Sequence, residues 1–94
     1  MIAVLLSYTV PIETIDTLRP AHVDWLKQGL ADGRLLLAGR KVPVTGGMLL
    51  VRGTLDEAKG WAATDPFATE GAADYEFIEV APSILAPGLE ALGQ

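Results

Sequence analysis

The amino-acid sequence predicts an α+β fold in which a four-stranded antiparallel sheet carries two helices on one face. The first observation is length: 94 residues suit one domain, so a single domain is expected over residues 1–94. The second is the pattern of apolar residues. Short β-prone apolar runs and stretches with helical spacing follow one another in the order β-α-β-β-α-β. This order is that of the ferredoxin-like, or split-βαβ, arrangement.

The strands predict an apolar sheet on both of its faces. They are expected at residues 2–8, 34–39, 48–52 and 75–80. In the first two, apolar residues occupy both alternating sets of positions, which is typical of a strand buried on both sides. Two short helices cover only one face of the sheet. A second copy packed sheet against sheet is the simplest cover for the other face, so we expect a homodimer, or a higher oligomer.

The first helix is expected over residues 14–33, where apolar residues recur at the three- and four-residue spacing of one helical face. Gly33 ends it. Pro20 leaves two alternatives open. If Thr17 caps the helix, Pro20 falls in the first turn, whose N–H groups have no partner within the helix. If the helix begins at Thr14, Pro20 kinks it.

The second helix is expected to begin after Thr54, which forms a capping box with Glu57 three residues later. It is expected to end at Asp65, because a residue that precedes proline is disfavoured in the helical region. A connector of small residues, 68–73, then leads to the fourth strand. Residues 85–92 form a short tail with a turn of helix.

The composition excludes several kinds of site. Cysteine is absent and there is one histidine, which excludes disulfides, thiolate chemistry and multi-histidine metal centres. No glycine-rich nucleotide fingerprint occurs, and we expect no metal and no cofactor. Twelve acidic against seven basic residues give a net charge of −5, which disfavours nucleic acid and anionic membranes as partners. No apolar run approaches the ~20 residues of a membrane span, and no signal peptide is recognisable, so we expect a cytoplasmic protein.

His22 and Asp65 are the first candidates for chemistry. His22 lies on the apolar stripe of the first helix, so it is either a hydrogen-bonded core residue or a general acid or base. Asp65 lies at the predicted end of the second helix, where the helix dipole disfavours a carboxylate. It is therefore either a solvated turn residue or compensated by a nearby group. Because both helices lie on the same face of the sheet, Asp65 can approach His22.

Four further residues are candidates for binding a substrate. Arg19 lies one helical turn before His22 and carries the planar guanidinium that binds carboxylates, although a surface arginine is the alternative. Ser7 and Tyr8 end the first strand and offer hydroxyls. One of them faces the helices, and the sequence leaves open which. Lys41 belongs to the only pair of adjacent basic residues, which either attracts an anionic substrate or lies in a solvated hairpin.

Four stretches of the chain resemble the YciI-like (YCII-related) family of the dimeric α+β barrel superfamily. They are residues 19–22 (Arg-Pro-Ala-His), 33–39, 46–51 and 65–67 (Asp-Pro-Phe). Better-known members have a longer hairpin and a Gly-Pro where this chain has Gly39-Arg40. The resemblance implies a ferredoxin-like protomer, a sheet-to-sheet dimer and an active site on a His–Asp pair, which falls on His22 and Asp65. The superfamily includes isomerases, dehydrochlorinases and cofactor-free oxygenases.

The sequence therefore favours a cofactor-independent enzyme, of lyase or isomerase type, that acts on a small anionic organic molecule. In this hypothesis Asp65 orients His22, whose Nε2 atom moves a proton, while Arg19 and a hydroxyl of Ser7 or Tyr8 position the substrate. The alternative is a non-enzymatic dimeric module of the same fold that binds a small ligand or a partner protein. A cofactor-free monooxygenase is the third possibility.

Overall fold

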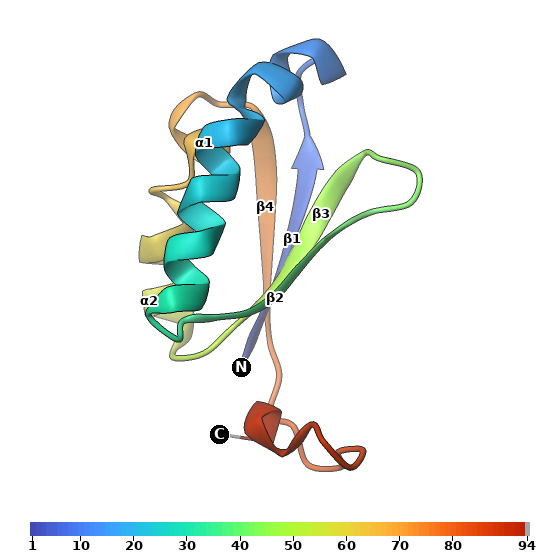
Figure 1. The fold of residues 1–94 in the computed structure, drawn as a ribbon, viewed down its shortest axis with the longest axis vertical. Coiled ribbons are helices and arrows are strands. Elements are labelled where there is room, and N and C mark those ends of the chain that lie inside the picture. Colours follow the sequence, from blue (N-terminus) through green and yellow to red (C-terminus); the bar gives the residue numbers. More distant parts are fainter. Residues whose placement is uncertain (94) are drawn as a thin grey trace.

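The computed structural model describes residues 1–93 and contains one four-stranded sheet in the order β2-β3-β1-β4. Its strands are β1 (Ile2–Tyr8), β2 (Leu35–Arg40), β3 (Gly46–Val51) and β4 (Ala73–Glu79). Each neighbouring pair is antiparallel. The helices α1 (Ile12–Ala31) and α2 (Leu55–Ala62) lie on the same side of the sheet (Figure 1). The ferredoxin-like fold predicted from the sequence is confirmed.

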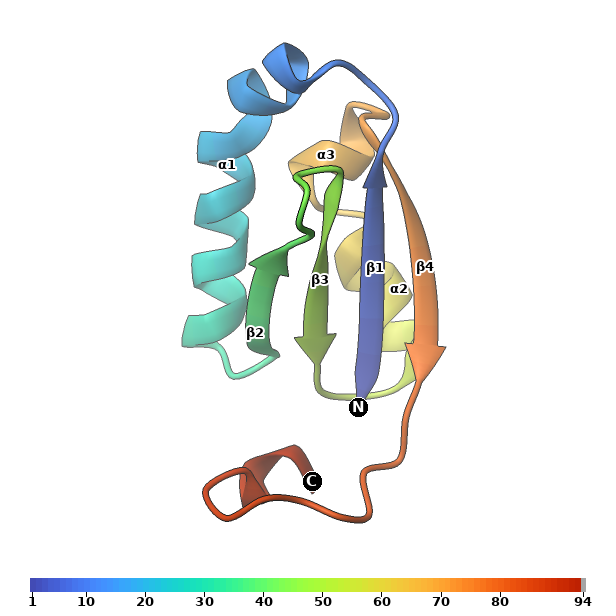
Figure 2. The same ribbon diagram turned by 90° about the vertical axis from the view of Figure 1, so that its right-hand side faces the viewer.

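The helices cover one face of the sheet and leave the other face uncovered. On β1, Ile2, Val4 and Leu6 face the helices and are buried in the core. Ala3 and Leu5 alternate with them and face the other way, onto the side toward the viewer in Figure 2. Their cross-strand neighbours there include Leu50, Met48 and Ile78. This part of the second face is therefore apolar, as predicted, although Asp74 and Glu76 of β4 also lie on the second face. No element between residues 1 and 93 covers it (Figure 2).

Helix α1 begins at Ile12, two residues earlier than the earlier of the two expected starts, and Pro20 lies inside it. Proline has no N–H, so the backbone carbonyl of Asp16 lacks its usual partner within the helix. The first turns of α1 are set at an angle to the rest of the helix (Figure 1). Helix α1 ends at Ala31, and Gly33 follows with a positive φ of 80°, as expected of the residue that ends a helix.

Helix α2 has the predicted capping box: the Thr54 hydroxyl accepts from the Glu57 N–H, and the Glu57 carboxylate accepts from the Thr54 N–H. The helix ends at Ala62, before the predicted Asp65. Asp65 instead begins a further helical turn, α3 (Pro66–Thr69), in a segment that the sequence assigned partly to a connector. The prediction that Asp65 lies at a helix C-terminus was therefore wrong, and the carboxylate meets the favourable end of a helix.

After β4 the chain runs past the ends of the strands, and the last described residues form a 3-10 turn, η1 (Glu90–Gly93) (Figure 2). The guanidinium of Arg52, the residue that follows β3, donates a hydrogen bond to the carbonyl of Ala91 in this turn, at 3.3 Å. Within residues 1–93, no helix is both long enough and apolar enough to cross a membrane.

Candidate active site

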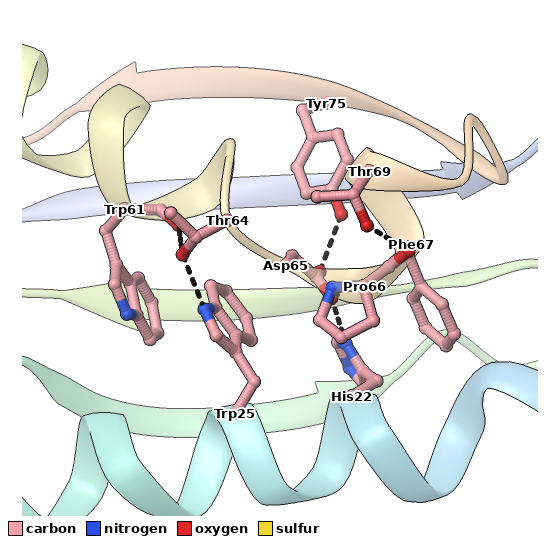
Figure 3. A network of polar contacts seen from close by, with 9 residues as sticks. All are labelled: His22, Trp25, Trp61, Thr64, Asp65, Pro66, Phe67, Thr69 and Tyr75. Carbon is pink, nitrogen blue, oxygen red and sulfur yellow. Dashed lines mark hydrogen bonds and ion pairs between the residues drawn. The ribbon is translucent and has the colours of Figure 1, made fainter.

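His22 and Asp65 meet between α1 and α3, although 43 residues separate them in the chain (Figure 3). His22 projects from the middle of α1, and Asp65 is the N-cap of α3. The distance from His22 Nδ1 to Asp65 Oδ1 is 2.7 Å. Asp65 is fully buried at 0% exposure, and His22 retains 9%. The sheet topology thus brings together the two residues that the sequence analysis singled out.

The local sequence fixes the position of Asp65. Pro66 holds Asp65 in an extended conformation, with φ −60° and ψ 131°, and proline itself suits the first position of a helix. An extended residue before a helix is an N-cap, and Asp65 Oδ1 accepts a hydrogen bond from the backbone N–H of Phe67 at 3.0 Å. The Asp65-Pro66 dipeptide therefore begins α3 and directs the carboxylate toward α1.

Three donors surround the Asp65 carboxylate. Oδ1 accepts from the N–H of Phe67 and faces His22 Nδ1, and Oδ2 accepts from the Tyr75 hydroxyl at 2.6 Å. Because an ionised carboxylate only accepts hydrogen bonds, we assign the proton of the bond between His22 and Asp65 to Nδ1. In the neutral ring, Nε2 is then the unprotonated nitrogen and the basic one.

Aromatic packing holds the imidazole in one plane. The Phe67 ring stacks on His22 with centroids 4.0 Å apart and planes 12° apart. Tyr8 meets Phe67 edge to face, at 5.8 Å. One residue of α3 therefore supplies both a backbone donor for Asp65 and a flat surface for His22, which restricts the imidazole to rotamers that keep the bond to Asp65.

A cavity of about 340 Å³ lies beside His22, between α1 and the inner face of the sheet. Its polar lining comprises Tyr8, Arg19, His22 and Arg40. The remaining lining residues are Leu6, Val23, Leu26, Ala38, Gly39, Gly47, Leu49 and Phe67. Small residues on β2 and β3 leave this space open, because no large side chain from those positions fills it. The volume suits a small organic molecule.

His22 lines this cavity, and its Nε2 atom is not buried in the core. Within residues 1–93, no buried side-chain nitrogen or oxygen lacks a hydrogen-bond partner. The hydrogen bonds of His22 run through Nδ1 alone, so Nε2 is not sealed inside the core. When Nδ1 carries the proton, Nε2 has an unshared electron pair that no protein group occupies.

Arg19 and Tyr8 are the predicted binding residues that line the cavity. The Arg19 guanidinium hydrogen-bonds to Asp16 at 3.0 Å. This bond raises the pKa of Arg19 above its ordinary value, against the opposing effect of partial burial, and the nearby Tyr8 hydroxyl raises it further. Arg19 is therefore cationic at any working pH. Of the two hydroxyls that end β1, Tyr8 is the one on the helix side.

Ser7 and Lys41 lie outside the lining of the cavity. The Lys41 ammonium donates to the Ser7 hydroxyl at 3.0 Å, and Ser7 pairs across the sheet with Gly46 and Asp74. Since Leu6 faces the helices, its neighbour Ser7 faces the uncovered side of the sheet. The structure thus brings these two predicted residues together, but apart from His22.

Arg40, rather than Lys41, lines the cavity, and a β-bulge is the reason. Leu35 faces the helices opposite Val51, and simple alternation from Leu35 would place Lys41 on the same face. The irregularity between Leu35 and Leu37 adds one residue to β2, which moves Arg40 to the helix side opposite Gly47. Lys41, the residue of this basic pair that was expected to bind substrate, therefore does not line the cavity.

Tyr75 and Phe67 are the other site residues that sequence reasoning missed. Tyr75 alternates with exposed residues along β4, as a half-buried residue of a one-sided strand does. That alternation places it toward the helices, but nothing in the sequence pairs it with Asp65. Within residues 1–93, no group of three or more histidine, cysteine, aspartate or glutamate side chains is arranged to hold a metal ion.

Comparison with curated proteins finds no match. Among solved structures, the chain is similar to a 5-chloro-2-hydroxyhydroquinone dehydrochlorinase from Burkholderia phenoliruptrix AC1100, determined in complex with 2,5-dihydroxybenzoquinone. The TM-score is 0.70 at 17% identity, and the match covers 85% of this chain and 93% of that one. This likeness supports the fold. The family model of the YCII-related domain matches residues 1–81, which include every element of the sheet and the candidate site. The chain therefore belongs to the YCII-related domain family.

Proposed function

We propose that this protein is an enzyme that performs acid–base chemistry, of lyase or isomerase type and without a cofactor, on a small anionic organic molecule. The observation that carries the proposal is the 2.7 Å bond between the His22 ring and a fully buried carboxylate, beside a cavity. A histidine that served packing alone would not need to line a cavity.

In the proposed mechanism, Nε2 of His22 removes a proton from the substrate at an atom next to a carbonyl or a leaving group. Asp65 holds the Nδ1–H in place and stabilises the positive charge that forms on the ring. The same proton then returns to another substrate atom in an isomerisation, or leaves with the departing group in an elimination. Dehydrochlorination, the activity named for the similar structure, is an elimination of the second kind.

The charges that line the cavity favour an anionic substrate. The chain carries a net charge of −5, yet two of its seven basic residues, Arg19 and Arg40, line this one cavity. A guanidinium binds carboxylate or phenolate oxygens through paired N–H donors, and the Tyr8 hydroxyl adds a neutral donor. We propose that the two arginines bind the anionic group while His22 faces the reacting atom.

Replacing Arg40 by glutamine should raise KM about tenfold or more while kcat changes little, because a charged hydrogen bond to bound substrate is lost. Steady-state kinetics on the wild type and the variant measure this. Lys27→Gln is the matched control: it removes an exposed positive charge of α1 that does not line the cavity, and it should leave KM unchanged. Equal KM values for Arg40→Gln and wild type would show that the anionic group of the substrate does not bind to Arg40.

The proposed activity can be tested with a panel of small hydroxylated aromatic acids, phenols and hydroxy acids, with and without a halogen as leaving group. Each is incubated with the protein, and mass spectrometry together with halide release reports conversion. Conversion of at least one compound, lost in His22→Gln, is the expected result. Saturable binding with no conversion across the panel would favour the alternative of a ligand-binding module.

We further propose that a second copy covers the uncovered face of the sheet. Leu37 and Ile78 remain 40% and 42% exposed there, next to the half-buried Leu5 and Leu50. An apolar face of this kind on a small domain is typical of an interface between copies. Sedimentation equilibrium at micromolar concentration should give twice the chain mass of 9.9 kDa, or a higher multiple. A mass of one chain would contradict the proposal.

A further inference from the structure

Tyr75 is the one residue of β4 that reaches the His22–Asp65 pair (Figure 3). Its hydroxyl donates to Asp65 Oδ2 at 2.6 Å, while Oδ1 serves both His22 and the backbone of Phe67. Three elements therefore converge on a single carboxylate: α1 through His22, α3 through Phe67 and β4 through Tyr75.

The N-cap bond does not by itself fix the carboxylate. The torsion about the bond between Cβ and Cγ of an aspartate is soft, so either oxygen can serve the Phe67 N–H as the group rotates. Rotation would carry the accepting oxygen away from Nδ1 of His22. Because Asp65 has no exposed surface, solvent water does not reach Oδ2 to hold it, and Tyr75 is its hydrogen-bond donor.

Tyr75 is suited to this role because it stays a donor. Burial raises the pKa of the Tyr75 hydroxyl, and the hydrogen bond to Asp65 and the charge of that carboxylate raise it further. The hydroxyl is therefore protonated throughout the pH range in which the protein is folded and working. Tyr75 does not line the cavity, so any effect on chemistry passes through Asp65.

We propose that Tyr75 is a positioning residue: by holding Oδ2 it sets the rotation of the Asp65 carboxylate, which keeps Oδ1 on Nδ1 of His22 and Nε2 directed at the substrate. This inference rests on the proposed function of the site, in which a misaligned His22 transfers protons more slowly. It assigns to β4 a part in the chemistry although no residue of β4 lines the cavity.

The test is the Tyr75→Phe variant, which keeps the ring beside Phe77, whose centroid lies 6.4 Å away. His22 is the only histidine, so its Nδ1 proton is identified without ambiguity by nitrogen-edited NMR. Exchange of this proton with water should be about tenfold faster or more in the variant, the size expected for losing a hydrogen bond to a charged group. Once a substrate is known, kcat should fall by a similar factor and KM should stay unchanged.

Two references separate positioning from a general loss of stability. The backbone amide of Val4, in the core strand, exchanges with water only when the protein unfolds globally. In Tyr75→Phe, its exchange rate should increase by a smaller factor than that of the His22 Nδ1 proton. Thr64→Val is the matched control, because it removes the 2.9 Å bond from Trp25 Nε1 next to Asp65 without touching the carboxylate. It should leave His22 exchange and kcat as in wild type.

Unchanged exchange of the Nδ1 proton in Tyr75→Phe would overturn the inference, and so would an equal acceleration in Thr64→Val. The outcome does not depend on finding a substrate. If no compound is converted but the variant still accelerates exchange, the proposed enzyme activity fails while the positioning role stands. If a compound is converted by the wild type, but Tyr75→Phe changes neither the exchange of the His22 Nδ1 proton nor kcat, the positioning role alone fails.

Discussion

Replacing Asp65 by alanine is expected to lower the free energy of unfolding by about 3–5 kcal/mol, the cost of removing one partner from a buried, hydrogen-bonded network. The fully buried carboxylate satisfies His22, Phe67 and Tyr75 at once. Alanine would leave all three donors without an acceptor and would also remove the N-cap of α3. Urea denaturation of wild type and variant measures the difference.

Asp24→Ala is the matched control for this loss, since it removes an exposed aspartate of α1 and should change stability by less than about 0.5 kcal/mol. Asp65→Asn should cost much less than alanine. The amide oxygen can still accept from Phe67 and His22, and the amide NH₂ group can donate to the Tyr75 oxygen. A loss below about 1 kcal/mol for Asp65→Ala would mean that the network contributes little to the fold.

Replacing His22 by glutamine is expected to reduce turnover by about 10²- to 10⁴-fold, the usual contribution of a positioned general base. Glutamine is a good helix former, and its amide can donate to Asp65 in place of Nδ1, so the fold should persist. It has no basic nitrogen to accept a proton from the substrate. Initial rates, with circular dichroism to verify folding, measure the effect. Retention of more than a tenth of the wild-type rate would exclude His22 as the base.

Asp65→Asn complements this experiment because it separates structure from chemistry. The variant keeps the hydrogen bonds but loses the negative charge that stabilises the protonated ring. We therefore expect near-normal stability with strongly reduced turnover. If stability and turnover fell together, Asp65 would act through the fold rather than through the charge of the pair.

The fold was predictable because its signals are local. Short β-prone apolar runs place the strands, helical spacing places the helices, and the capping box at Thr54 marks the start of α2. The topology then follows from the order of the elements, and it places α1 and the segment after α2 on one face. His22 and Asp65 could be brought near each other on that basis alone, before any distance was known.

The finer geometry of the site depends on features that such patterns do not encode. One extra residue in β2 exchanges Arg40 and Lys41 between the two faces of the sheet. The Asp65-Pro66 dipeptide is compatible both with the end of one helix and with the N-cap of the next, and the structure has the second arrangement. The bond from Tyr75 joins two elements whose register is set by packing, so the sequence offers only the side on which that ring lies.

The central claim is that His22 acts as a base through Nε2 while its Nδ1–H is bonded to Asp65. Determining the tautomer of His22 tests this claim most directly. The proposed chemistry requires a neutral imidazole with the proton on Nδ1, shared with Asp65, and a free electron pair on Nε2. Because the chain has a single histidine, its two ring nitrogens can be assigned directly from ¹⁵N chemical shifts. We predict a protonated-nitrogen shift for Nδ1 and an unprotonated one for Nε2. The reverse assignment, with the proton on Nε2, would contradict the account, because Nε2 would then have no electron pair with which to accept a proton from the substrate.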